Sequence, residues 1–240
     1  MFLLSRYIMW FDKILQKSGS WENLIMSSLV DMKCLQKLLG DKENLKSPQN
    51  IYAIFPEKME AVIVKVFESN RQILSQFSMN LNNHLIASKV RECSEQLQNV
   101  TAIPRLFRRT NRKPPKKAST YMIEAIKPII DLHEKYKNAD SDIMEPLLNN
   151  IIPRVTNSYS TLVHDVLQSV CKTEESLRRL KSRNIPSNDD TQCPSSEIVT
   201  DEMKIREQIK LDINYFTNML RKIGAPNSNE ALTKLGEHLS

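Results

Sequence analysis

Glycine is scarce in this chain. Only four of its 240 residues are glycine, whereas average usage of about 7% would give about 17. Glycine supplies the positive φ angles that tight hairpins and phosphate-binding loops need, and the four glycines, Gly19, Gly40, Gly224 and Gly236, lie far apart. The sequence therefore contains no Walker loop and no dinucleotide-binding motif. This argues against nucleotide-binding α/β folds and against sandwiches built from tight hairpins.

Paired cysteines and long apolar runs are also lacking. The four cysteines contain no Cys-x-x-Cys spacing, which favours free thiols in a reducing compartment over disulfides or a zinc site. No apolar run approaches the ~18 residues of a membrane-spanning helix. The apolar opening is broken by Arg6 and has no small-residue cleavage site, so we expect no signal peptide. These features predict a soluble, cytosolic protein.

Apolar residues at helical spacing are present in nearly every part of the chain. They predict helices over residues 1–17, 21–39, 59–81, 85–100, 119–130, 141–150, 152–183, 201–223 and 231–239. We find no convincing strand alternation and no fixed repeat. The pattern therefore predicts an all-α fold, a series of antiparallel helices in one or two bundles.

The composition changes between these helices in two places. A stretch from residue 105 to 117 carries seven cations, no anion and two adjacent prolines, although the net charge of the whole chain is only +6. Residues 184–198 are polar and contain two prolines, which is typical of a disordered loop. We expect an N-terminal helical bundle over 1–103, a basic connector over 104–118, and a C-terminal bundle over 119–240 with a flexible loop at 184–198.

Residue types that carry catalysis are not grouped in the sequence. The four histidines are scattered, and no Gly-x-Ser-x-Gly or His-Glu-x-x-His pattern occurs. Cys34, Cys93 and Cys171 fall at or beside apolar helix positions, where a free thiol acts as a small hydrophobic group. We expect no catalytic residue, no metal ligand and no cofactor.

The basic connector is the one segment with a physical case for binding. Its cations could attract anionic lipid head groups, an acidic protein or nucleic acid, or they could simply be solvated in a linker. Phe107 is the only aromatic residue among them, so stacking on bases is poorly supported, and we predict no nucleic-acid partner. The candidate binding residues are Arg105, Arg108, Arg109, Arg112, Lys113, Lys116 and Lys117.

Three stretches resemble the C-terminal region of subunit two of the conserved oligomeric Golgi complex. Residues 103–113, followed by Ala118-Ser-Thr-Tyr121, are similar to the family's Pro-Arg-Leu-Tyr-Arg-Arg-Thr-Asn segment and the Ser-Tyr after it. Residues 163–181 resemble its Val-Ser-Asp-Val-Leu-x-Ser-Val-x-Lys-Met-Glu-Glu-Ser-Leu-x-x-Leu-Lys helix. Residues 201–212 resemble its Asp-Asp-Lys-Ile-Arg-x-Gln-x-x-Leu-Asp segment, with one extra residue. The connector departs from the family by being more basic.

The resemblance implies helical bundles stacked as a rod and a role without catalysis. Such a complex captures vesicles at the cytosolic face of the Golgi apparatus, as a peripheral membrane component, and supports retrograde intra-Golgi transport and Golgi organisation. The implied partners are other subunits of the complex, SNAREs, Rab GTPases and golgin coiled coils. From the residues alone, the alternative is a helical adaptor that binds anionic lipid or an acidic partner through residues 105–117.

Overall fold

Helices make up every regular element that the structure describes. The computed structural model describes residues 2–17, 21–38, 60–108, 110–138, 141–183 and 200–223, and no strand occurs in these ranges. The all-α prediction is therefore confirmed. The predicted loop at 184–198 and the predicted helix at 231–239 lie outside the described residues, and the stacking of bundles into a rod stays a prediction. The elements are α1 (Phe2–Lys17), α2 (Trp21–Leu38), α3 (Glu60–Leu97), the 3₁₀ helix η4 (Gln98–Ala102), α4 (Ile103–Phe107), α5 (Thr120–Tyr136), α6 (Ser141–Arg183) and α7 (Asp201–Ile223).

Two helices are longer than the sequence pattern predicted. Helix α3 joins the stretches expected at 59–81 and 85–100, because the three polar residues between Leu81 and Leu85 include neither glycine nor proline, and both leucines are buried. Helix α6 joins the stretches expected at 141–150 and 152–183, although it contains Pro146 and Pro153. A proline removes one backbone hydrogen bond, and at both positions the helix continues, with buried apolar residues on either side.

The chain divides into two compact units, one comprising residues 1–88 with 140–143 and the other residues 89–139 with 144–240. The predicted division into bundles over 1–103 and 119–240, with a connector over 104–118, stays a prediction. In the first unit, the rings of Phe11 and Phe77 meet edge to face at 5.5 Å between centroids. Lys33 Nζ lies 2.6 Å from Asp142 Oδ2, an exposed ion pair that contributes at most ~1 kcal/mol.

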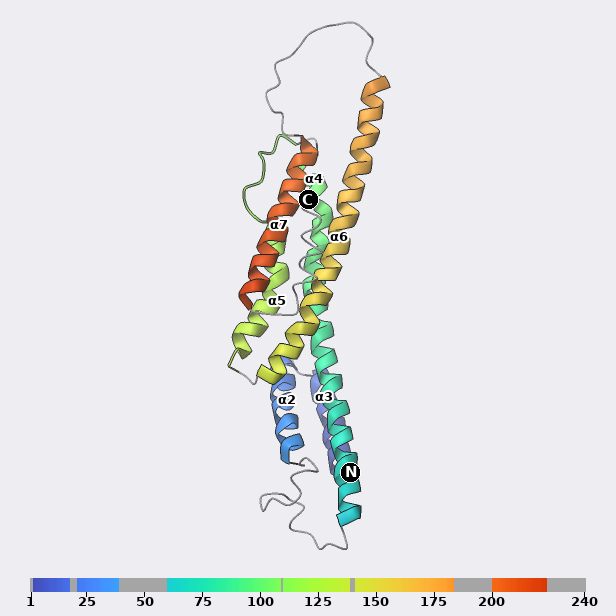
Figure 1. Ribbon diagram of the computed structural model, residues 1–240, viewed down its shortest axis with the longest axis vertical. Coiled ribbons are helices and arrows are strands. Elements are labelled where there is room, and N and C mark those ends of the chain that lie inside the picture. The colour runs from blue at the N-terminus through green and yellow to red at the C-terminus, as the bar shows by residue number, and fades with distance from the viewer. Residues whose placement is uncertain are drawn as a thin grey trace. The chain divides into compact units, whose positions relative to one another are not determined.

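The second unit is built around α5, α6 and α7. Helix α6 runs in the opposite direction to the other two, while α4 and α5 follow one another along α7 (Figure 1). At its centre, the fully buried rings of Tyr159 and Phe216 lie 5.4 Å apart between centroids. The apolar stripes predicted for these helices supply the rest of this core, including Met122, Ala125, Ile126, Ile129, Ile205, Ile209, Ile213 and Leu220.

The stripe on α5 gives a matched test of this packing. Ile126 is 0% exposed, whereas Ile123, on the same helix, is 47% exposed. Ile126→Ala should lower the free energy of unfolding by about 2–5 kcal/mol because it removes buried methyl groups and leaves a cavity. Ile123→Ala should cost about 0.5 kcal/mol or less. Urea denaturation followed by circular dichroism measures both, and equal losses would contradict the assignment of α5's inner face.

Candidate functional site

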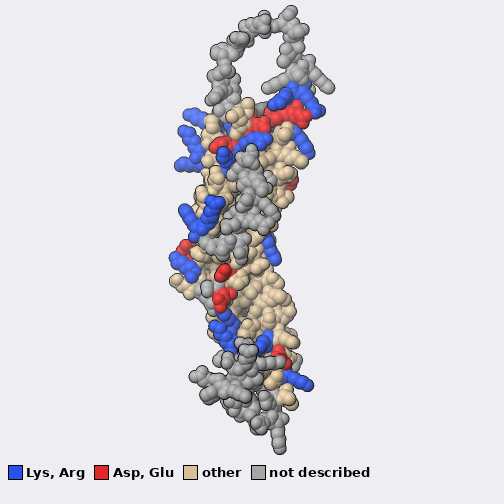
Figure 2. Space-filling model, in the orientation of Figure 1, with Lys and Arg blue, Asp and Glu red and all other residues tan. Residues whose placement is uncertain are grey.

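Four of the seven cations predicted to bind lie on a segment that forms no regular helix. Arg105 is exposed on α4, Arg108 is half-buried directly after that helix, and Arg109 lies outside the described residues. From residue 110 to 119 the chain forms no regular helix, and its four cations are exposed, namely Arg112, Lys113, Lys116 and Lys117. We call residues 110–119 the basic strap. Lys and Arg side chains gather along the edge where it lies (Figure 2).

The basic strap is anchored at its first end by α4. Three of that helix's five residues, Ile103, Pro104 and Phe107, are buried. The Arg108 backbone N–H donates to the Pro104 carbonyl oxygen at 3.0 Å, and Thr110 Oγ1 donates to the Leu106 carbonyl oxygen at 2.7 Å. The helix ends because the Arg108 backbone leaves the helical conformation, with φ −66° and ψ 124°, and the two hydrogen bonds hold the start of the strap against α4.

The second end of the basic strap is held by one carboxylate, that of Asp212 on α7. Ser119 donates its backbone N–H to Asp212 Oδ1 at 2.6 Å and its hydroxyl to Oδ2 at 2.9 Å. The Tyr121 hydroxyl donates to Oδ2 at 2.9 Å. Gln208 Nε2 lies 3.0 Å from both Asp212 Oδ1 and the Lys117 carbonyl oxygen. Asp212 is fully buried, so this cluster, which we call the Asp212 clamp, fixes the strap to α7.

Sequence reasoning missed the Asp212 clamp. A signal was present, because Gln208 and Asp212 are four residues apart and interrupt the apolar stripe of α7 next to Ile209 and Ile213. Polar residues on a buried helix face need hydrogen-bond partners. Their partners lie 91 to 93 residues away along the chain, and that distance is why periodicity alone could not identify them.

Burial raises the pKa of the Asp212 carboxyl above its ordinary value of 3.8, while the hydrogen bonds from Ser119, Tyr121 and Gln208 oppose that rise. A proton on the Asp212 carboxyl fits on Oδ2, because Oδ2 faces the hydroxyls of Ser119 and Tyr121, and a hydroxyl can accept a hydrogen bond as well as donate one. Oδ1 instead faces two N–H groups, which can only donate. Burial also raises the pKa of the Tyr121 phenol, which keeps its proton available for this hydrogen bond.

The Arg108 side chain is the other unusual group at this site. Its Nε and Nη2 atoms are buried and have no hydrogen-bond partner among the described residues. This contrasts with Asp212, whose two oxygens accept four hydrogen bonds. The second end of the strap thus contacts a buried acid, Asp212, whose oxygens accept hydrogen bonds from the described residues. At the first end lies Arg108, two of whose guanidinium nitrogens have no acceptor among the described residues.

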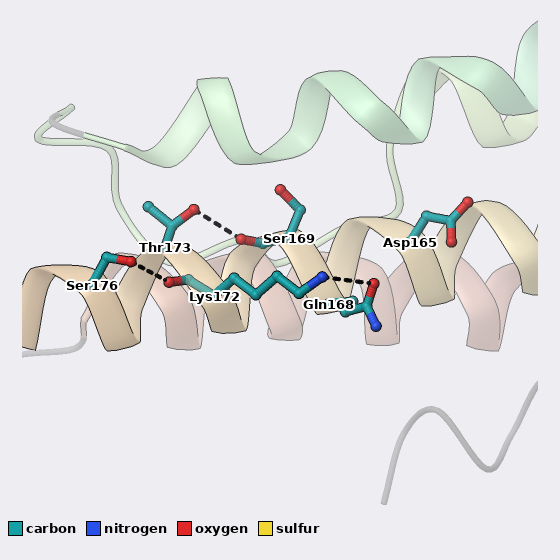
Figure 3. Close-up of a pocket in the computed structure, with 6 residues that line it drawn as sticks. All are labelled: Asp165, Gln168, Ser169, Lys172, Thr173 and Ser176. Carbon is teal, nitrogen blue, oxygen red and sulfur yellow. Dashed lines mark hydrogen bonds between the residues drawn. The ribbon is translucent and has the colours of Figure 1, made fainter.

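A shallow hollow on the surface of α6 is not a site for chemistry. Its lining comes from one helix face, and the polar groups mostly satisfy one another (Figure 3). Thr173 Oγ1 donates to the Ser169 carbonyl oxygen at 2.8 Å, and Ser176 Oγ donates to that of Lys172 at 2.9 Å. Lys172 Nζ donates to Gln168 Oε1 at 3.3 Å. No set of groups here converges on a substrate-sized space.

The remaining candidate groups are dispersed. Cys93 is buried, and burial raises the pKa of its thiol to about 12. Cys34 and Cys171 are exposed, so the prediction that they act as apolar packing groups is wrong for these two. Within the described ranges, no group of three or more His, Cys, Asp or Glu side chains could hold a metal ion. None of the described helices is both long enough and apolar enough to span a membrane.

Comparison with known proteins decides the family. The family model described as COG complex component, COG2, C-terminal matches residues 1–213. The chain belongs to this family. The resemblance seen in the three sequence stretches is thereby confirmed.

Named relatives of the COG2 family agree with this assignment. The chain is 33% identical to conserved oligomeric Golgi complex subunit 2 of Homo sapiens over 197 residues, which is 79% of this chain and 26% of that protein. It is 30% identical to the subunit 2 of Drosophila melanogaster, covering 92% of this chain and 32% of the relative. The chain therefore spans about a quarter to a third of the length of these relatives. No solved structure matches it.

The raised pKa of Asp212 predicts a specific dependence of stability on pH. From about 3.8 up to the raised pKa, the folded chain retains a proton that the unfolded chain has released, so the free energy of unfolding falls as pH rises. Asp212→Asn removes this titratable group, so the free energy of unfolding of the variant should fall less steeply as pH rises above about 4. Urea denaturation over this range measures the slopes.

The matched control is Asp165→Asn, which changes an exposed carboxylate on α6 and should leave the slope close to that of the unsubstituted chain. An Asp212→Asn slope equal to that of the unsubstituted chain would show that Asp212 does not gain a proton on folding.

Proposed function

We propose that this chain is part of a subunit of the Golgi vesicle-tethering complex and acts through protein–protein contacts in retrograde intra-Golgi transport and Golgi organisation. The observation that carries the proposal is the family match over residues 1–213. The all-α fold supports it, because packed helices offer long surfaces for other helical subunits. The proposed location is the cytoplasmic face of the Golgi apparatus, where the subunit is peripheral to the membrane.

The proposed partners are first the other subunits of the complex, which the names of the relatives imply. SNAREs, Rab GTPases and golgin coiled coils are further proposed partners. We propose no catalytic activity. This is supported by the dispersal of titratable groups over the described helices, because catalysis requires such groups to converge in a pocket.

A chimera tests the tethering role without requiring this chain to assemble alone. In human cells that lack subunit 2, the human protein with its matching C-terminal region deleted should fail to restore normal cell-surface glycans. The same protein carrying this chain in place of that region should restore them, because transport recycles Golgi glycosyltransferases. Lectin binding measured by flow cytometry reports the outcome. A chimera that is expressed and joins the complex but leaves lectin binding defective would contradict the proposal.

A second proposed function is that the basic strap binds an anionic surface, either anionic lipid or an acidic partner. The observation that favours it is the exposure of Arg112, Lys113, Lys116 and Lys117 on a segment held at both ends. Anchoring the strap before binding reduces the conformational entropy lost on association. Residues 105–117 include no Asp or Glu, and their exposed cations attract anions over about one Debye length.

Charge reversal tests this second function. Arg112, Lys113 and Lys116 changed together to Glu should weaken binding of the full chain to phosphatidylserine vesicles and to a tetraglutamate peptide by at least about tenfold at low salt. The effect should shrink at higher ionic strength because exposed charges are screened. Sedimentation measures vesicle binding, and fluorescence anisotropy measures peptide binding.

The control is the triple change of Lys127, Arg221 and Lys222 to Glu, which alters net charge equally at exposed positions on α5 and α7. If both triple variants bind equally well, or if neither probe binds the unsubstituted chain, the strap is a solvated linker.

A further inference from the structure

The first unit exposes apolar side chains that a helical bundle normally buries. Seven of the twelve large apolar side chains exposed in the described ranges lie in this unit, and they occur on α1, α2 and α3. On α1, Met9 is 62% exposed and Trp10 is 54% exposed, and on α3 Val62 and Val66 are 60% and 45% exposed. Tryptophan is usually largely buried, and exposed apolar groups that gather on a surface mark interaction sites.

The position of the two valines on α3 shows that they continue a face that is buried elsewhere. Val62, Val66, Ile73 and Phe77 follow one another at spacings of four, seven and four residues, so they lie on one face of the helix. Phe77 is buried, and its ring meets that of Phe11 on α1. The same face of α3 is therefore covered at its middle and uncovered toward its N-terminal end, where its spacing suits another helix.

A cation accompanies each of these exposed apolar groups. Lys13 lies three residues after Trp10, and Lys65 lies three residues after Val62, so each lysine is on the same side of its helix as the apolar residue. Both lysines are exposed. A helix that covers the apolar residues and carries acidic side chains along its edges would match both the apolar centre and the charged rim.

We propose that Met9, Trp10, Val62 and Val66 form a surface that receives amphipathic helices from the part of subunit 2 that this chain does not span. The inference rests on the proposed function, in which the chain is part of such a subunit. The matching family model describes a C-terminal region, and the chain spans 26% and 32% of the human and Drosophila relatives. The larger part of a complete subunit therefore lies in the same polypeptide as this surface.

The size of the surface favours the same polypeptide over a separate protein. Four side chains that are already partly covered bury less than the ~800 Å² per partner of a typical stable contact between separate proteins. A segment joined through the chain is held at a high effective concentration and loses less translational and rotational freedom when it packs. A smaller apolar contact is then sufficient.

Photo-crosslinking in the human chimera tests this contact. With p-benzoylphenylalanine in place of Trp10, irradiation should attach this chain to a helix of the human part other than the one that leads into the junction. Mass spectrometry of the digested product identifies the attached peptide. The matched control places the same group at Met203, which is 57% exposed but lies on α7 in the second unit, and should not give that product.

A protease site at the junction of the chimera gives a second test. After cleavage, the two parts should elute together in gel filtration. Trp10→Glu with Val66→Glu should raise the dissociation constant of the parts by about tenfold or more, because it places carboxylates in an apolar contact. The matched control, Met203→Glu with Ile123→Glu at 57% and 47% exposed positions of the second unit, should change it less than about threefold. In the chain by itself, both double variants should keep the urea midpoint of the unsubstituted chain, because all four positions are exposed.

The outcomes separate this inference from the proposed function. Crosslinks from position 10 to residues 39–59 of this chain, to another subunit or to lipid would each overturn the inference, as would separation of the cleaved, unsubstituted chimera. A chimera that restores lectin binding without the expected crosslink supports the tethering role and overturns the inference. A chimera that gives the crosslink but leaves lectin binding defective supports the inference and contradicts the tethering role.

Discussion

The carboxylate of Asp212 is the contact on which the arrangement of the second unit depends. It is fully buried on α7 and accepts hydrogen bonds from the backbone and hydroxyl of Ser119, from Tyr121 and from Gln208. Ser119 also occupies the N-cap position of α5, so the same contacts set where that helix begins. One side chain thereby joins the end of the basic strap, the start of α5 and the middle of α7.

The Asp212 clamp explains how a cation-rich, proline-containing segment keeps a defined path. Such a segment has little apolar surface to bury and its like charges repel one another, so nothing within residues 110–117 favours a single conformation. Order is imposed from the two ends, by the buried residues of α4 and by the Asp212 clamp. The exposed cations of the strap therefore lie on a backbone that is held at both ends. The anchoring of both ends of the strap is the feature that the sequence did not predict.

Periodicity predicted the parts of the fold that depend on the local sequence of one helix. The stripes of α5 and α7, including Ile126 and Phe216, were predicted because burial of one helix face repeats every three or four residues. The continuity of α3 and α6 was not predicted, since tertiary packing overrides short polar interruptions and single prolines. The four glycines all lie outside the described residues.

The candidate site was predictable in one respect only. Composition identified the cations, but it could not separate Arg108, which is half-buried, from exposed neighbours such as Arg112 and Lys113. Asp212 and Arg108 show the reason. A buried charge is stable only when its hydrogen-bonding groups are satisfied, and whether they are depends on residues far away in the sequence. Asp212 finds its donors within the unit and is therefore a structural group. Among the described residues, Nε and Nη2 of Arg108 have no hydrogen-bond acceptor, and composition gives no sign of this difference between two charged residues.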